Sequence, residues 1–301
     1  MTIKFYCPSC DSLIAFDSRH AGKRARCTTC GQIFVIPSRD DEKPEKLEPE
    51  PEKTEPLPGF YRAVFLDSWK IFFKSENATS LVFVAAVVCF KFFLSPVMCC
   101  GYITFYVVWG WLLAFYLNII YETAFEIEQL PQIRFATSTT LGEVAYLWYI
   151  IKPFLVFLYT MFIVQLPFII ALALLEDKDL TYDNMWQAQT GFHLLLQVLF
   201  IFGLFLFPMA VLTTAVGRDI TLLRPDYILL PLFRAFMPYL VVVALLVAAC
   251  VLEMQTTQYD YSDFAITARR LALNLAVQVI AIIAMRSIGL FYRHYSCHFK
   301  W

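Results

Sequence analysis

Four cysteines near the start of the chain have the spacing of a metal site. They form two Cys-x-x-Cys pairs, Cys7 with Cys10 and Cys27 with Cys30, and sixteen residues separate the pairs. Tetrahedral zinc binds four thiolates at about 2.3 Å, and two such pairs at the tips of paired hairpins bring four sulfurs together. Because four ligands close the coordination shell, the predicted zinc is structural and leaves no position for a catalytic water.

Two other uses of these cysteines are a disulfide framework and a redox site built on one Cys-x-x-Cys pair. The string CPSC at 7–10 and polar residues follow Lys4, where the apolar region of a signal peptide would have to lie, so we expect an N-terminus that is not exported. A compartment that keeps thiols reduced favours zinc over disulfides. A domain of about 37 residues buries too little apolar surface to fold alone, so zinc binding would supply the folding free energy.

Short alternating stretches predict β-strands around Ile3 and Phe5, at 13–16 and at 33–36, and Gly31 can adopt the left-handed turn after the second pair. Three short strings include the first cysteine pair and flank the second, namely FYCPSC at 5–10, AGK at 21–23 and FVIP at 34–37. Together with the cysteine pairs, these strings resemble the small bacterial zinc-ribbon finger family, which is found at the N-termini of otherwise diverse proteins, many of them membrane proteins. The resemblance covers residues 1–37 and implies zinc ligation by the four cysteines without a fixed partner. The chain differs at Asp11, where the family usually has glycine or another small residue.

Residues 38–58 read as a linker. They contain eight acidic residues, four basic residues and five prolines, with hardly an apolar side chain. Such a composition cannot bury a core and is typical of disordered chain. We therefore expect a disordered, acidic, Pro-rich tether between the zinc ribbon and the rest of the protein.

The remainder of the chain has the composition of a membrane protein. Of the 301 residues, 59% are hydrophobic and only 16% are charged, and the net charge of -1 excludes nucleic-acid binding by bulk charge. About twenty apolar helical residues cross a bilayer, and six runs qualify. These runs are 79–98, 102–121, 153–175, 193–215, 236–252 and 271–291. The alternative is one span over 92–121 in place of the first two.

Charge asymmetry between the loops supports six spans. Basic residues outside the zinc ribbon and the tether were counted on each side of the membrane. With six spans, ten of them lie on the same side as the N-terminus and three lie on the opposite side. Removing one span would move every later loop to the other side. Both termini are then predicted to be cytoplasmic, in the cytoplasmic (inner) membrane of a bacterium. The first group is Arg62, Lys70, Lys74, Arg134, Lys152, Arg218, Arg224, Arg234, Arg293 and Lys300, and the second is Lys178, Arg269 and Arg270.

Three aromatic segments, 60–74, 141–151 and 225–236, precede the odd-numbered spans and are predicted to be interfacial helices, each followed by a brief break. The predicted fold is an all-α polytopic membrane protein with six transmembrane helices plus interfacial helices, and a small N-terminal β zinc ribbon. Its parts are the zinc ribbon at 1–37, the linker at 38–58 and the membrane domain at 59–301. Segments 121–131 and 207–209 are weakly similar to bacterial six-span membrane families of unknown function.

Polar residues inside the spans are the first place to look for chemistry. Lys91 and Arg286 are the only charged ones, and we expect both to extend to opposite membrane interfaces. Glu253 falls just after the fifth span, which leaves no embedded acid for a proton relay. The uncharged polar residues either hydrogen-bond neighbouring helices or line a polar cavity. They are Asn118, Gln165, Gln197, Asn274 and Gln278.

Two further clusters could bind metal. Glu122, Glu126 and Glu128 end the second span and are interpreted as a solvated helix end, facing Arg218 or Arg234, or as paired carboxylates of a site. The sequence between 294 and 298 reads HYSCH, which is interpreted as a polar tail or a three-ligand site. Serine-hydrolase, Walker and dinucleotide-binding patterns do not occur in the sequence, so we do not expect an enzyme.

These features favour a multi-pass, zinc-binding membrane protein that acts as an anchored binding or scaffold protein. Its cytoplasmic zinc ribbon would recruit a protein partner while the lipid-embedded body fixes the position. Nucleic acid is not expected as a partner. The alternative is a transporter or lipid-handling membrane protein that is regulated by its zinc ribbon.

Overall fold

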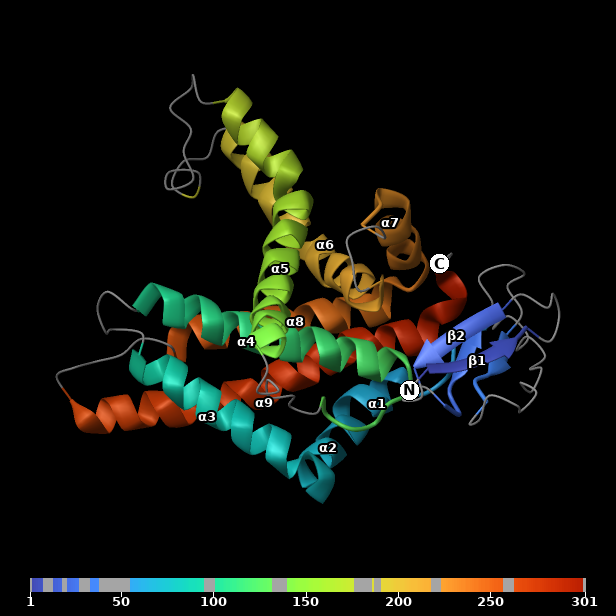
Figure 1. Ribbon diagram of the computed structural model, residues 1–301. Coiled ribbons are helices and arrows are strands. Elements are labelled where there is room, and N and C mark those ends of the chain that lie inside the picture. The colour runs from blue at the N-terminus through green and yellow to red at the C-terminus, as the bar shows by residue number, and fades with distance from the viewer. Residues whose placement is uncertain are drawn as a thin grey trace. The chain divides into compact units, whose positions relative to one another are not determined.

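The computed structural model describes residues 2–7, 13–17, 21–26, 33–37, 55–94, 101–131, 140–175, 186, 191–217, 223–256 and 263–299 (Figure 1). The chain divides into two compact units, Met1–Thr54 and Glu55–Trp301. The first unit contains all four described strands, and the second contains the described helices.

The N-terminal unit consists of two antiparallel hairpins. Strand β1 (Thr2–Tyr6) pairs with β2 (Leu13–Asp17), and β3 (Arg24–Arg26) pairs with β4 (Ile33–Val35). One predicted Cys-x-x-Cys pair falls in the chain that connects β1 to β2, and the other falls in the chain that connects β3 to β4. Of the four cysteines, only Cys7 belongs to the described residues; Cys10, Cys27 and Cys30 lie outside them.

A small apolar core joins the two hairpins. Its fully buried members are Ile3, Phe5, Cys7, Phe34 and Ile36. Because side chains alternate along a strand, the core residues of β1 face inward while their neighbours Lys4 and Tyr6 are exposed. The Phe5 and Phe34 rings meet edge to face with their centroids 5.3 Å apart. These five side chains are too few to stabilise a domain alone.

The second unit is built from nine labelled helices and short 3-10 turns within its described residues. They are α1 (Phe60–Phe65), α2 (Lys70–Phe73), α3 (Ala78–Leu94), α4 (Gly101–Ala124), α5 (Thr140–Leu174), α6 (Gly191–Gly217), α7 (Pro225–Arg234), α8 (Phe236–Thr256) and α9 (Phe264–Tyr295). Six of these, α3, α4, α5, α6, α8 and α9, are long and apolar enough to cross a membrane. The unit is therefore an α-helical multi-pass membrane domain. The run between Lys91 and Glu122 divides into α3 and α4, so the single-span alternative is wrong.

The segments before the odd-numbered spans differ from one another. Two of them are short helices followed by a break, namely α1 with α2 before α3, and α7 before α8. Pro225 occupies the first turn of α7, as predicted. The predicted break near residue 151 is wrong, because α5 continues without interruption through Pro153. Figure 1 shows that α5 instead bends sharply along its length, and a proline inside a helix is a known cause of such a bend.

The chain on both sides of 60–74, the first predicted interfacial segment, is tied to the long helices. Before the segment, the Leu57 amide donates to the His294 carbonyl oxygen at 2.8 Å. The hydrogen bond from Lys70 holds the pKa of the Asp67 carboxyl below its usual value, and the charges of Lys70 and Arg62 act in the same direction. Asn77 donates to the Ile71 carbonyl and accepts from the Leu130 amide, both at 2.9 Å. The chain before α3 is thereby fixed to the chain after α4.

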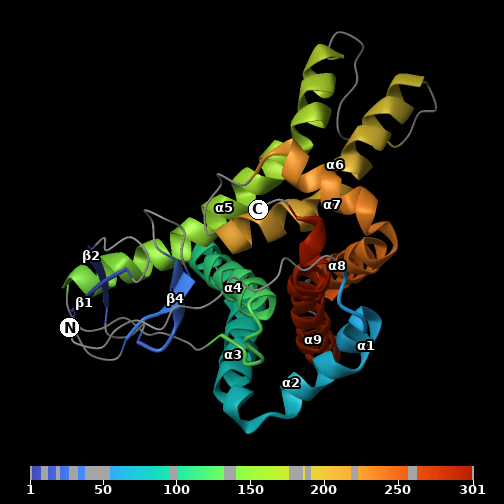
Figure 2. The same ribbon diagram turned by 90° about the vertical axis from the view of Figure 1, so that its right-hand side faces the viewer.

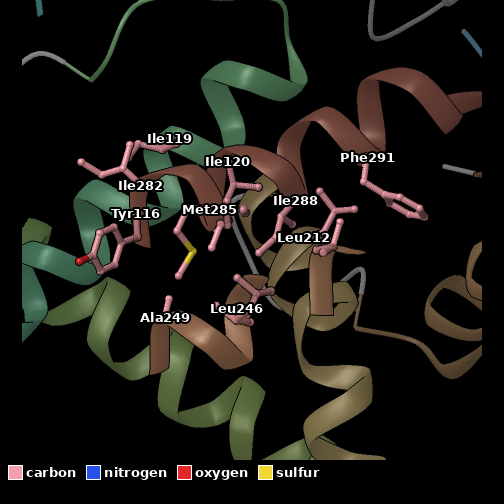
Figure 3. Packing of buried hydrophobic residues seen from close by; sticks show 14 of the residues in the cluster. Tyr116, Ile119, Ile120, Leu212, Leu246, Ala249, Ile282, Met285, Ile288 and Phe291 are labelled. Atoms are coloured by element: carbon pink, nitrogen blue, oxygen red, sulfur yellow. The ribbon is translucent and has the colours of Figure 1, made fainter. Parts of the chain in front are cut away.

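Helices α4 and α9 form the centre of the membrane domain. Figure 3 shows buried side chains of α4, α6, α8 and α9 meeting in one core, with Tyr116, Leu212, Leu246 and Met285 among them. The α4 and α9 backbones approach closely at Gly289, where an added Cβ would lie 2.6 Å from the Ile120 carbonyl oxygen. A glycine at this position permits the close crossing of the two helices.

The hairpin of α5 and α6 extends from this core. In Figures 1 and 2 the later part of α5 and the first part of α6 run side by side and extend away from the other helices. In Figure 1 they make a steep angle with α4 and α9. Their distal ends form a separate apolar cluster around Phe168 and Leu196. Many outward side chains of this hairpin are large and apolar, including Ile170, Leu174 and Leu194. Such a surface fits contact with lipid.

Candidate functional site

A buried ion pair lies inside the membrane domain. The ammonium group of Lys91, near the end of α3, is hydrogen-bonded to the carboxylate of Glu253, in the last turn of α8. The two side chains are only 4% and 17% exposed. Lys91 Nζ also lies 4.9 Å from the centroid of the Trp109 ring on α4, which is the geometry of a cation–π contact. The free-energy cost of removing two opposite charges from water together is far lower than the cost of burying one of them without its partner.

Polar side chains of α9 complete the environment of the carboxylate. Glu253 Oε2 accepts hydrogen bonds from the amides of Gln278 at 2.8 Å and Asn274 at 3.3 Å. Asn274 also donates to the Thr256 hydroxyl at 2.9 Å, while the Gln278 carbonyl oxygen accepts from the Tyr116 hydroxyl at 2.5 Å. The result is one hydrogen-bonded network that joins α3, α4, α8 and α9, and we call it the Lys91–Glu253 network.

The sequence did not predict this network. Lys91, which we expected to extend to a membrane interface, is buried and paired with Glu253. Glu253 does not follow the fifth span, because α8 continues to Thr256 and carries the carboxylate inside. The argument against an embedded acid is therefore wrong. The signal that could have found it was Lys91 itself, since a lone lysine in an apolar run requires a partner. Tyr116 and Thr256 gave no such signal.

Arg286 is the second charged residue of the spans. It is 8% exposed and its Nε has no hydrogen-bond partner within the described part of the chain. It lies in α9 three residues before Gly289, on the segment that packs against α4. Its side chain is packed within the described part of the domain, and its extension to a membrane interface stays a prediction.

The predicted amides mostly connect helices. Gln165 of α5 donates to the Phe200 carbonyl of α6 at 3.2 Å, where Gly203 leaves room for it. Asn274 and Gln278 belong to the Lys91–Glu253 network. These contacts match the first of the two expected roles, hydrogen bonding between neighbouring helices. Asn118 lines a cavity.

The predicted glutamate cluster is divided among basic partners. Glu126 lies 3.5 Å from Arg293, and Glu128 lies 3.2 Å from Lys74. Glu126 adopts a left-handed conformation with φ 66, which ends the helical path of α4. Two partners were predicted for this cluster, Arg218 and Arg234. Arg218 lies outside the described residues, and the two ion pairs are formed with Arg293 and Lys74 instead of Arg234.

The C-terminal histidines and cysteine do not converge. His294 Nδ1 lies 2.9 Å from the Leu57 carbonyl oxygen, and Cys297 Sγ lies 3.7 Å from His298 Nδ1. Within the described ranges, no group of three or more histidine, cysteine or acidic side chains could hold a metal ion. This covers the glutamate cluster and the C-terminal cluster, but three of the four predicted zinc ligands lie outside those ranges.

A cavity of about 360 Å³ opens between α4, α5 and α6. Its polar lining comes from Asn118 and Tyr121 of α4, Lys152 of α5 and Thr214 of α6, and Trp148 stands at its side. The volume falls in the range of small-molecule sites. The sequence identified Asn118 as a candidate cavity residue, whereas nothing in the pattern associated Lys152 or Thr214 with it.

No protein-family model matches this chain, and no curated protein or solved structure matches it at a significant level.

Proposed function

We propose that this protein is a membrane-anchored binding protein whose cytoplasmic zinc ribbon recruits a protein partner. The observation that carries the proposal is the placement of the cysteines: each Cys-x-x-Cys pair falls in the connection of its own antiparallel hairpin. Hairpin tips of this kind bring four thiolates together around one structural zinc. Cys7, Cys10, Cys27 and Cys30 would be its ligands.

The core of the N-terminal unit supports this assignment. Cys7 is fully buried beside Phe5 and Phe34, and backbone hydrogen bonds of 2.9 Å join Ile36 to Gly22 and Lys23. The hairpins therefore share one core next to the first cysteine. Because this core is small, a metal ion would be needed to make the fold stable.

The surface of the unit supports partner binding. Tyr6 is 63% exposed and precedes Cys7 directly, and the basic side chains of Lys4 and Lys23 are exposed as well. Tyrosine is a typical anchor of protein interfaces, and exposed lysines attract a partner of opposite charge. An acidic surface on a cytoplasmic protein would complement them.

The proposal predicts partner contact that depends on the ribbon. A photo-crosslinking amino acid at Tyr6 in the full-length protein is expected to give a defined protein adduct in cells. The adduct should disappear in the Cys27→Ser, Cys30→Ser variant, because the surface loses its fold. The control is the same probe at Phe264, which is 88% exposed in α9 and lies on the predicted outer side. An adduct at Tyr6 that survives the double substitution contradicts the proposal.

A second candidate is a lipid-handling or transport role of the membrane domain. Two observations favour it: the carboxylate of Glu253 inside a span, and the cavity beside Lys152. The sequence did not predict the carboxylate inside a span, and it offered the cavity only as one of two roles for Asn118. In this case the zinc ribbon would regulate the membrane domain.

A further inference from the structure

The cavity between α4, α5 and α6 continues onto the surface of α5. A second cavity, of about 510 Å³, is lined by α5 alone and shares Trp148, Lys152 and Val156 with the first. The first cavity has polar groups on its walls, whereas the second is almost entirely apolar. The two together form a groove with a polar end and an apolar tail, which we call the α5 groove.

One face of α5 builds the apolar tail. Leu155, Leu158, Tyr159 and Phe162 occupy positions i, i+3, i+4 and i+7, so they lie on one side of the helix. Each of these side chains is about half exposed. A row of exposed apolar side chains along a membrane helix offers an acyl chain a continuous contact surface.

The polar end carries a positive charge. Lys152 is the one charged side chain in the described lining of either cavity, and it lies one residue after the start of the apolar span Ile151–Leu174. Trp148, which is 57% exposed, and Tyr121 stand beside it, as aromatic residues do at membrane interfaces. Asn118 adds an amide group at the same end, whereas the Thr214 hydroxyl donates within α6, to the Ala210 and Val211 carbonyl oxygens.

From these observations we infer that the α5 groove binds an anionic phospholipid. The phosphate lies at Lys152 beside Tyr121 and Asn118, which line the same cavity, and one acyl chain follows the α5 face from Leu155 to Phe162. Basic pockets between membrane helices bind anionic headgroups by this combination of charge and hydrogen bonds. The continuous apolar tail selects a lipid over a free phosphate. This inference deepens the second candidate function and does not depend on the zinc ribbon.

The test is lipid binding by the purified full-length protein in detergent, measured by native mass spectrometry with phosphatidylglycerol and phosphatidylcholine. The wild-type protein is expected to bind phosphatidylglycerol at least about fivefold more tightly, which is the contribution of one lysine near an anionic surface. Lys152→Gln should remove this preference, and Lys152→Arg should keep most of it. Arg234→Gln, which removes an exposed charge from α7, is the matched control and should change nothing.

Three results would overturn the inference. Equal binding of the two lipids by the wild-type protein would show that the groove does not select negative charge. An unchanged preference in Lys152→Gln would place the anionic site elsewhere. Binding of a water-soluble glycerophosphate as tight as that of the long-chain lipid would show a phosphate site without an acyl chain. Loss of the partner adduct at Tyr6 has no bearing on any of these results, so the two proposals fail separately.

Discussion

Replacing Glu253 by glutamine is expected to lower the free energy of unfolding of the membrane domain by about 3–5 kcal/mol. The physical reason is that the ammonium group of Lys91 then stays buried without a compensating charge. The amides of Asn274 and Gln278 also lose their ionised acceptor. The measurement is an equilibrium denaturant titration of the protein in detergent micelles.

A matched control uses an exposed ion pair of the same domain. Arg224 and Asp226 lie 3.3 Å apart with both side chains more than half exposed, so Asp226→Asn should cost less than about 1 kcal/mol. Combining Lys91→Met with Glu253→Gln should recover part of the lost stability, because no uncompensated charge remains. Stability of Glu253→Gln within about 1 kcal/mol of the wild type would mean that the buried pair is not formed.

Zinc removal is expected to unfold the N-terminal unit. Purified protein should contain one zinc per chain, and the Cys27→Ser, Cys30→Ser variant should contain none. Structural zinc contributes about 10–16 kcal/mol in small domains, far more than a core of five side chains can replace. Elemental analysis gives the metal content, and hydrogen exchange of the β1–β4 amides reports the fold.

The control for this pair of substitutions is Cys250→Ser. Cys250 is an exposed cysteine of α8, in the membrane domain, so its replacement should leave the zinc content at one per chain. Stoichiometric zinc in the Cys27→Ser, Cys30→Ser variant would exclude the four-cysteine site. Protection of the β1–β4 amides in a metal-free variant would show that the apolar core suffices to fold the unit.

The sequence predicted the membrane helices well because their apolar runs are long. All six predicted spans overlap a helix that is able to cross a membrane, including the division of the 79–121 region into α3 and α4. Hydropathy reports local composition, and here the local signal is strong. The strands at Thr2–Tyr6 and Ile33–Val35 also lie where alternation predicted them.

The buried polar contacts could not be predicted because they join distant segments. Lys91 and Glu253 are 162 residues apart, and so are Tyr116 and Gln278. Sequence patterns are local and treat each charge as isolated. The sequence therefore predicted Glu253 outside the fifth span and Lys91 extending to a membrane interface. The same holds for the α5 groove, because Lys152 lines a cavity only together with residues of other helices, such as Asn118 and Thr214.

The connection between α5 and α6 is the most direct test of the proposed topology. Because α3, α4 and α5 are counted as three spans, this connection must lie opposite both termini. Reporter fusions after Pro58, Lys178, Pro225 and Asp260 measure the side of the membrane on which each point lies. Six spans with cytoplasmic termini predict a cytoplasmic, external, cytoplasmic and external signal in that order. An external signal at Pro58 would remove the reducing environment of the proposed zinc ribbon, and a cytoplasmic signal at Lys178 would contradict six spans.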